Sequence, residues 1–228
     1  MKCGIVFDVD GVLIDVENSY RAAIKLTAQK FLNREVKDSE VKRVKLELGI
    51  NNDWFATKRI IEDSGMEVSL EEIIREFNKF YETLKHTEKL LIGHGVLREI
   101  RELSRPMGVV TGRPRKDLEE GFNKFSLWEY FDFIVDEDTI PERDLRKPHP
   151  FALSFCLKNL GVDTCVYIGD TLADYMMLEG FKKQSGLRAH FINLGPEFMG
   201  IKSSKFGYLL EEIQEGLHAL ELKQECRQ

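Results

Sequence analysis

The chain has 228 residues, of which 43% are hydrophobic and 32% are charged, and its formal net charge is −6. This composition is typical of a globular protein that is large enough to bury a core without disulfides or metals. The negative charge disfavours nucleic acid as a partner. No apolar run approaches the roughly 18 residues of a membrane span, so we expect no membrane association.

The first eleven residues, MKCGIVFDVDG, lack the apolar region and cleavage site of a signal peptide. The four cysteines, Cys3, Cys156, Cys165 and Cys226, are dispersed without CxxC spacing, which favours passive thiols in a reducing compartment. We therefore predict a cytoplasmic protein. The sequence leaves open whether it is a monomer or a homodimer.

Short, nearly continuous apolar runs predict strands that are covered on both faces. Helical patterns separate most of these runs, and a further helix is expected near the C-terminus. This alternation predicts an α/β fold with a doubly wound, mainly parallel sheet, that is, a Rossmann-like core. The expected strands are 4–9, 107–110, 131–135, 165–169 and 189–194, and the expected helices are 114–125, 148–160, 172–181 and 209–222.

One connection differs, because residues 15–92 show helical patterns and no convincing strand. We predict an all-α helical cap domain at 15–92, inserted into a core domain formed by 1–14 and 93–228. Gly93 and Gly95 are candidate hinges, and a rigid excursion packed permanently on the sheet remains an alternative. The expected helices are 17–32, 39–48, 53–63 and 70–91, the last capped by Ser69 with Glu72.

Two aspartates follow the first predicted strand, in the stretch VFDVDGVLID. Residues i and i+2 of a strand point to the same side, so Asp8 and Asp10 should converge at its carboxyl end, where ligands bind in open α/β sheets. Two adjacent carboxylates repel each other unless a cation intervenes, and hard oxygen ligands favour Mg²⁺. The alternative is a simple Asp-Gly turn.

Further acids end another apolar run, in YIGDTLAD. Asp170 should lie at the end of this strand, and Asp174 should lie one turn into the following helix, facing the same place. Either residue could instead cap the helix. Acids at the ends of two separate strands favour a shared site over coincidence.

Phosphate donors are expected at a third strand end, in GVVTGRP. The Thr111 hydroxyl and the Gly112 N–H suit phosphate oxygens, and Arg113 could add a charged contact. Lys147, before a helix that starts with proline, could also reach a phosphate. Helix capping by Thr111 and a solvated Lys147 are the alternatives.

Four motifs in this order resemble the haloacid dehalogenase superfamily: DVDGVL (8–13), VVTG (109–112), Lys147 in RKPHP, and GDTLAD (169–174). Many members also carry a helical cap directly after the first motif. The resemblance implies that Asp8 is the nucleophile and that Asp10 is first the general acid and then the general base.

The same resemblance implies a bound Mg²⁺, held by Asp8, the main-chain carbonyl of Asp10 and Asp170, with Asp174 nearby. Thr111, Gly112 and Lys147 would then hold the phosphoryl oxygens.

We therefore predict a Mg²⁺-dependent phosphatase acting on a small phosphorylated metabolite. A phosphosugar mutase would use the same motifs. The presence of Asp10 disfavours a dehalogenase. A phosphonate hydrolase is disfavoured because the insertion has no lysine in an apolar setting. The insertion itself disfavours a receiver-type phospho-switch.

Substrate choice is expected to come from the helical insertion. Its polar turn LGINNDWF offers Asn51 and Asn52, and Arg21 on the first inserted helix could contact an anionic group. Helix capping by Asn52, with Trp54 in the core, is the interpretation that we favour for this turn.

Overall fold

The computed structural model describes residues 2–225. The chain divides into two compact units, Met1–Ile14 with Leu90–Gln228, and Asp15–Lys89. We call the first the core unit and the second the helical unit. Among the residues that the structure describes, no helix is both long enough and apolar enough to cross a membrane.

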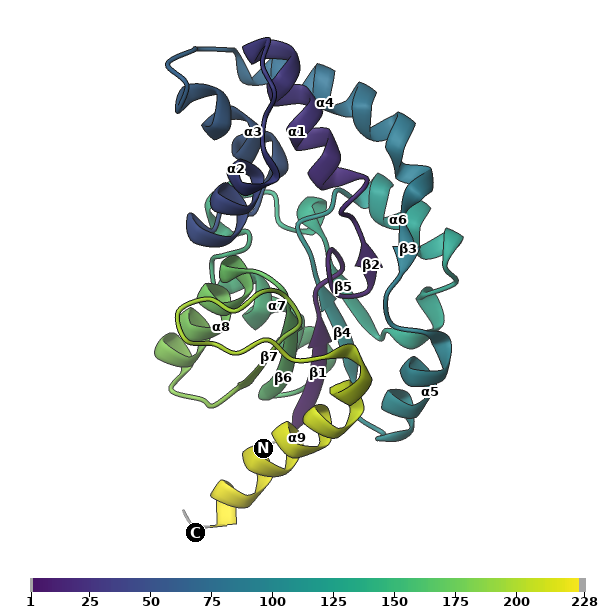
Figure 1. Ribbon diagram of the computed structural model, residues 1–228. Helices are drawn as coiled ribbons and strands as arrows, with labels where there is room; N and C mark the ends of the chain where they lie inside the picture. The colour runs from purple at the N-terminus through teal and green to yellow at the C-terminus, as the bar shows by residue number, and fades with distance from the viewer. Residues whose placement is uncertain (1, 226–228) are drawn as a thin grey trace. The chain divides into compact units, whose positions relative to one another are not determined.

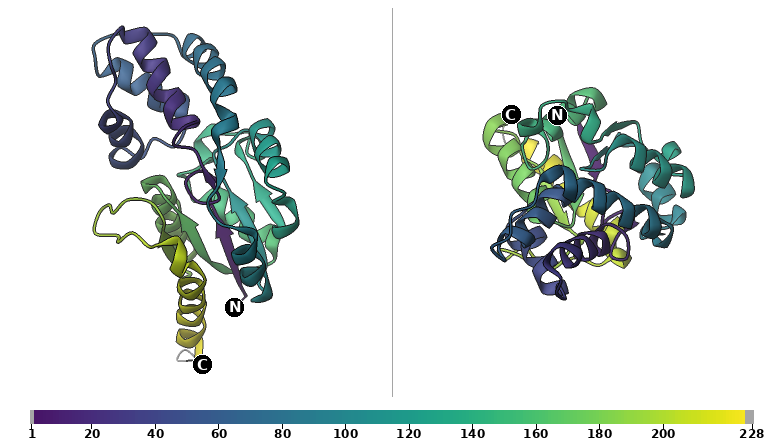
Figure 2. Two further views of the ribbon diagram at one scale, coloured as in Figure 1. Left: turned by 45° about the vertical axis from the view of Figure 1, so that its right-hand side comes forward. Right: turned by 90° about the horizontal axis from the view of Figure 1, so that it is seen from above.

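The core unit contains a five-stranded parallel sheet in the order β5-β4-β1-β6-β7 (Figures 1 and 2). Strand β1 lies at the centre, with Phe7 in register with Val109 on one side and Ile168 on the other. All five residues of β1 are buried, as expected for a strand covered on both faces. The predicted α/β fold is therefore confirmed. The bounds are β1 Cys3–Phe7, β4 Met107–Val110, β5 Phe133–Val135, β6 Thr164–Gly169 and β7 His190–Asn193.

Helices cover both faces of this sheet (Figure 1). Tyr167 of β6 packs in the core beneath α7 (Phe151–Leu160) and α8 (Leu172–Ser185). The preceding residue, Val166, faces α9 (Leu209–Glu225), where Gly216 leaves room for it. Consecutive strand residues point to opposite faces, so α7 and α8 cover one face and α9 covers the other. The remaining helices of the unit are α5 His94–Glu102 and α6 Arg115–Lys124.

Helix α5 was not predicted from the sequence. Its two buried residues, Leu97 and Ile100, are three positions apart and so lie on one face, a helical spacing that the reading of the sequence overlooked. Gly93 is its N-cap, with a φ of −65° that any residue can adopt. The backbone at this predicted hinge therefore does not require glycine.

The helical unit is built around the packing of α1 (Tyr20–Leu32) against α3 (Asp53–Glu62) and α4 (Leu70–Leu84). The rings of Tyr20 and Tyr81 stack with centroids 4.1 Å apart. Ser69 caps α4 by accepting a hydrogen bond from the Glu72 N–H, as predicted. These contacts give the unit an apolar core of its own.

Two predictions within this unit were wrong. The helix expected at 39–48 is instead α2 (Asp38–Lys42) followed by a π-helical turn, Arg43–Glu47, in which the Leu48 N–H bonds the Arg43 carbonyl. The helix expected at 70–91 ends at Leu84.

The predicted absence of strands from 15–92 was also wrong, because β2 (Ile14–Asp15) pairs with β3 (Lys89–Leu90). The buried carboxylate of Glu88 accepts a 3.0 Å hydrogen bond from Ser19 and draws the chain into an extended conformation before β3. Short 3₁₀ turns occupy Lys85–Thr87, Trp128–Tyr130, Glu137–Thr139, Arg143–Leu145 and Phe206–Tyr208.

Candidate active site

The carboxyl ends of three neighbouring strands bring the predicted site residues of the core unit to one edge of the sheet. Asp8 follows β1, Thr111 follows β4 and Asp170 follows β6. The Asp8 N–H still bonds the Ile168 carbonyl at 2.9 Å, so the chain stays in register beyond the end of β1. Parallel pairing therefore places residues from distant parts of the sequence side by side.

Three of the four acids that the sequence predicted to converge gather at this edge, whereas Asp10, predicted to converge with Asp8, is not in this group. Asp8, Asp170 and Asp174 each offer an oxygen within 4.8 Å of the others, and all three residues are buried. Burial raises the pKa of Asp8 well above its usual value, and the neighbouring acids raise it further, although Lys147 acts in the opposite direction. Burial with two other acids therefore disfavours the charged form of Asp8, and a further cation would favour it.

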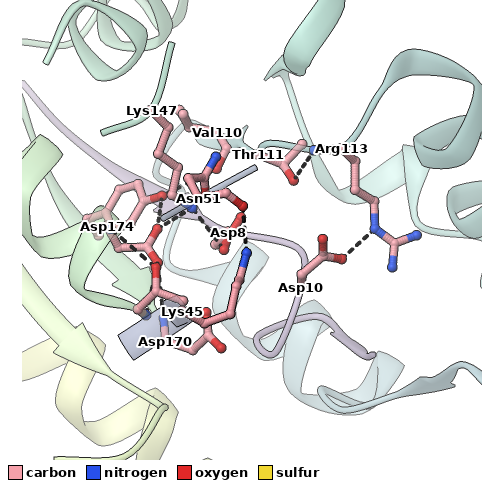
Figure 3. A network of polar contacts seen from close by, with 12 residues as sticks. Asp8, Asp10, Lys45, Asn51, Val110, Thr111, Arg113, Lys147, Asp170 and Asp174 are labelled. Carbon is pink, nitrogen blue, oxygen red and sulfur yellow. Dashed lines mark hydrogen bonds and ion pairs between the residues drawn. The ribbon is translucent and has the colours of Figure 1, made fainter. Parts of the chain in front are cut away.

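Lys147 lies between two of these acids (Figure 3). Its Nζ is 2.9 Å from Asp8 Oδ2 and 2.5 Å from Asp174 Oδ1, and only 2% of its side chain is exposed. Burial alone would lower the pKa of Lys147, but the Asp174 and Asp8 carboxylates raise it overall, so the ammonium stays charged. The structure thus rejects the alternative of a solvated lysine.

Asp174 is occupied by protein donors. Its Oδ2 accepts hydrogen bonds from the Asp170 N–H and from both the N–H and the hydroxyl of Thr171, in a capping box at the start of α8. Its Oδ1 accepts from Tyr167 as well as from Lys147. Helix capping, the alternative that the sequence left open, therefore applies to Asp174, which also orients Lys147.

Two glycines allow this close packing around the acids. A Cβ on Gly169 would lie 2.6 Å from Asp174 Cγ. A Cβ on Gly195 would lie 1.9 Å from the Asp170 carbonyl oxygen, and the Gly195 N–H is held by Asn193 Oδ1 at 3.0 Å. The loop after β7 therefore supports the main chain of Asp170. Sequence reasoning missed the supporting residues Tyr167, Asn193 and Gly195, because nothing in their spacing relates them to the acids.

Thr111 and Gly112 lie at the end of β4, as expected. The buried Thr111 hydroxyl accepts a hydrogen bond from the Arg113 N–H at 3.2 Å, and α6 is capped at Pro114. Helix capping by Thr111 is therefore not what the structure shows. The hydroxyl instead belongs to a tight turn at the end of β4, next to β1 in the sheet.

Arg113 lies away from the group formed by Asp8, Lys147 and Asp174. Its guanidinium is completely buried, and its Nε donates a 2.5 Å hydrogen bond to Asp10 Oδ1 (Figure 3). The sequence predicted a phosphate contact for this arginine. The structure pairs it instead with the predicted general acid.

The three remaining predicted residues belong to the helical unit. Asn52 caps α3, as its side chain accepts from the Trp54 and Phe55 N–H groups. The Asn51 carbonyl accepts from Lys45, and Arg21 pairs with Glu17. The capping interpretation of Asn52 is thus confirmed. Trp54 is only partly buried, so its predicted place in the core was wrong.

Comparison with known protein families gives a match over most of the chain. The haloacid dehalogenase-like hydrolases match residues 5–180. A protein from Phytophthora nicotianae, named imidazoleglycerol-phosphate dehydratase, is 33% identical over 75% of this chain and 39% of its own length. A phosphoglycolate phosphatase from Photorhabdus laumondii is 25% identical over 75% of this chain and 74% of its own length. Other curated phosphoglycolate phosphatases are matched over 63% to 69% of their length.

Solved structures give the same result for the fold. The phosphatase Tt82 from Thermococcus thioreducens superposes with a TM-score of 0.62 and is 26% identical, covering 92% of this chain and 99% of that one. A predicted phosphoglycolate phosphatase from Haemophilus somnus superposes with a TM-score of 0.69 at 18% identity, covering 92% of this chain and 96% of that one.

Proposed function

Because the chain belongs to the haloacid dehalogenase-like hydrolase family, we propose that it is a Mg²⁺-dependent phosphatase, which hydrolyses a small phosphate monoester through an aspartyl-phosphate on Asp8. One observation carries this proposal. The Asp8 carboxylate is buried beside Lys147 and two further acids, and within residues 2–225 its Oδ1 has no hydrogen-bond partner. A buried carboxylate oxygen without a donor is costly unless a cation or substrate uses it.

The chemistry of these residues fits a hard divalent cation. Carboxylate and carbonyl oxygens are the ligands that Mg²⁺ prefers. The carboxylates of Asp8 and Asp170 and the main-chain carbonyl of Asp10 would hold the ion. When bound, it would supply positive charge that reduces the repulsion between Asp8 and an anionic phosphate.

In the first half of the reaction, an Asp8 oxygen attacks phosphorus and the bond from phosphorus to the leaving oxygen breaks. Asp10, carrying a proton at the start, donates that proton to the leaving oxygen, and the alcohol departs. Lys147 is held by Asp174 beside Asp8, so its ammonium can also meet the phosphoryl oxygens.

In the second half, the Asp10 carboxylate removes a proton from water while the water oxygen attacks phosphorus. The bond between phosphorus and Asp8 breaks, inorganic phosphate leaves, and Asp10 has regained its proton for the next cycle. The Thr111 hydroxyl and the Gly112 N–H would hold the phosphoryl oxygens during both displacements, because such transfers depend mainly on positioning and electrostatics.

The core unit would then be the catalytic domain and the helical unit its cap. A cap closes over the reacting groups and excludes water, so it also selects the leaving group. Asn51 and Arg21 are the candidate substrate contacts in this unit. Asn52 is a weaker candidate, because its side-chain oxygen already caps α3.

Phosphate release from a panel of small phosphomonoesters, with Mg²⁺ and with excess chelator, tests the proposal. Phosphoglycolate belongs in the panel because several curated relatives carry its name. Release that requires the metal and disappears in Asp8→Asn is the expected result. No release from any member by folded wild-type protein would contradict the proposal.

The panel should also contain phosphosugars, because a phosphosugar mutase on the same scaffold is the alternative. A mutase would convert a phosphosugar to an isomer while releasing little inorganic phosphate. Sugar phosphate isomers and phosphate are therefore measured in the same samples.

A further inference from the structure

Asp10 pairs with Arg113, and none of the roles proposed above gives this contact a task. We infer that Arg113 is a positioning residue, which holds the Asp10 carboxylate in the orientation needed to transfer a proton to the leaving oxygen. This inference rests on the proposed phosphatase function. It assigns a task to a residue that the sequence had associated with phosphate.

The first argument is burial. The Arg113 side chain has 0% exposure, whereas that of Asp10 is 28% exposed. A guanidinium is rarely buried unless it is paired, because its loss of hydration must be offset by hydrogen bonds and opposite charge. The fixed member of the pair is therefore the arginine, and the accessible member is the acid that has to reach substrate.

The second argument is geometry. Nε of Arg113 donates to Oδ1 of Asp10 at 2.5 Å. The arginine therefore holds one carboxylate oxygen of Asp10, Oδ1, and this contact limits how the carboxylate can turn. The buried guanidinium is planar and rigid, so even a single hydrogen bond from it restricts the carboxylate more than a flexible lysine ammonium would.

The third argument is that the surrounding fold accommodates the guanidinium. Arg113 belongs to the turn that begins at Thr111, where its own N–H bonds the Thr111 hydroxyl and its carbonyl accepts from the Glu137 N–H at 2.9 Å. On helix α6, Gly121 lies beside the guanidinium, and a Cβ there would be 3.1 Å from Nη1. The main chain is thus held on both sides of Arg113, and α6 leaves space for the charged group.

The turn also couples the two halves of the site. Thr111 is a proposed phosphate ligand, and the residue two positions later orients the proposed acid. A change in the backbone of this turn would therefore move Thr111 and the Asp10 carboxylate together. The distance between the phosphate contact and the proton donor would then change little.

The test compares two leaving groups. The alcohol of an alkyl phosphate needs a proton as it departs, whereas 4-nitrophenolate from 4-nitrophenyl phosphate does not. We measure kcat/KM of wild type, Arg113→Met, Arg113→Lys and Asp10→Asn on both. The alkyl substrate is phosphoglycolate, or the alkyl phosphate that turns over fastest in the panel.

If Arg113 positions Asp10, Arg113→Met should lose about 10²-fold or more on the alkyl phosphate and about 10-fold or less on the aryl phosphate, as expected for impaired general acid catalysis. Asp10→Asn should show the same selectivity. The double variant should lose no more on the alkyl phosphate than Asp10→Asn alone, because both changes remove one function. Arg113→Lys should recover part of the loss.

Two results separate this role from other roles of the arginine. Inhibition by inorganic phosphate should be unchanged in Arg113→Met. If Arg113 were a phosphate ligand, its removal would weaken this inhibition. The partly exposed neighbour Arg115, which pairs with Asp136, supplies the control, because Arg115→Met removes an arginine from the same segment and should leave the ratio of the two activities unchanged. Equal losses on both substrates, additive losses in the double variant or weakened phosphate inhibition would each overturn the inference.

Arg113→Met could fail to fold, so Gly121→Ala provides a second route. Alanine favours the helix by about 1 kcal/mol relative to glycine, while its Cβ crowds both the guanidinium and Ile14 Cδ1, at 3.1 Å from each, and leaves both charges in place. We expect a selective loss on the alkyl phosphate, with folding checked by the thermal midpoint of the variant. An unchanged ratio would count against the inference. Wild type that releases no phosphate would overturn the proposed function itself, and with it this role of Arg113.

Discussion

Asp8 and Asp10 are separated by a single residue, yet their side chains lie in opposite electrostatic surroundings. Asp8 is buried with two further carboxylates, and Lys147 is the cation beside it. Asp10 is partly exposed and is paired with a completely buried arginine. The first environment carries excess negative charge that a cation can neutralise. The second is a charge pair that fixes one carboxylate at the surface.

Under the proposed mechanism, this difference allows two like residues to perform two tasks. A nucleophile needs a fixed place near a bound cation and phosphate, whereas an acid and base needs access to the leaving oxygen and to water. The two side chains obtain these settings from different motifs, through Lys147 for Asp8 and through Arg113 for Asp10. Each environment can be altered separately, which gives the following predictions.

The largest effect is expected at Asp8. Asp8→Asn should lower phosphate release by at least about 10³-fold. It should not lower the thermal midpoint in metal-free buffer, because it removes one of three buried acids that repel each other. Mg²⁺ should raise the midpoint of wild type and not that of the variant, as differential scanning fluorimetry can show. A variant that Mg²⁺ stabilises as much as wild type would mean that Asp8 does not hold the ion.

Removal of Lys147 should also be severe, but through stability as well as activity. Lys147→Met leaves Asp8 and Asp174 buried without their cation, and breaking a buried ion pair in this way costs about 3 to 5 kcal/mol. Urea denaturation measures the loss. Lys182→Met, which removes a partly exposed lysine from a surface pair with Glu179, is the control and should cost about 1 kcal/mol or less. Similar losses in both variants would contradict the central place of Lys147.

A smaller effect is expected at Tyr167, whose hydroxyl donates a 2.7 Å hydrogen bond to Asp174. Tyr167→Phe should lower the free energy of unfolding by about 1.5 to 3 kcal/mol, the usual range for a hydrogen bond to a charged group. Activity should fall less than in the Lys147 variant, because Asp174 keeps its bonds from Thr171. Tyr175→Phe on α8 is the matched control, and an equal loss there would show that the effect is one of packing.

The smallest effect lies outside both environments, in the helical unit. Hydrogen bonds from Lys30 and Lys79 lower the pKa of Glu76 to about 2, from an ordinary value of 4.5. A lowered pKa adds stability at neutral pH, and this contribution is lost as the pH falls from about 4.5 towards 2. The stability difference between wild type and Glu76→Gln should therefore be constant near pH 7 and shrink below about pH 4.5. Urea midpoints across this range test it, with Glu71→Gln on the same helix as the control.

Much of the core unit could be predicted because strand ends carry their own signal. The runs before Asp8, Thr111 and Asp170 are continuously apolar, and parallel strands meet at one edge, so sequence alone brought these residues together. No comparable sequence pattern indicates where the end of a long side chain will lie. Arg113 follows Thr111 by two residues, and only the packing of Gly121 and the position of Asp10 decide where its guanidinium lies.

The helical unit was predicted less well for a related reason. Strands of two residues, such as β2 and β3, are too short to show periodicity, and their pairing depends on contacts between residues far apart in sequence. The buried hydrogen bond between Ser19 and Glu88 is one such contact. Capping, in contrast, is local, and the predictions for Ser69 and Asn52 were confirmed.

Direct detection of a phosphorylated Asp8 tests the central claim of different tasks for the two aspartates. Acid quench during turnover, followed by borohydride reduction, converts an aspartyl-phosphate to homoserine, which peptide mass spectrometry locates in the sequence. We predict modification at Asp8, none at Asp10, and an increased amount in Asp10→Asn if release of phosphate is slowed more than its transfer. Phosphate release by wild type without modification of Asp8, or modification of Asp10 in its place, would contradict the account.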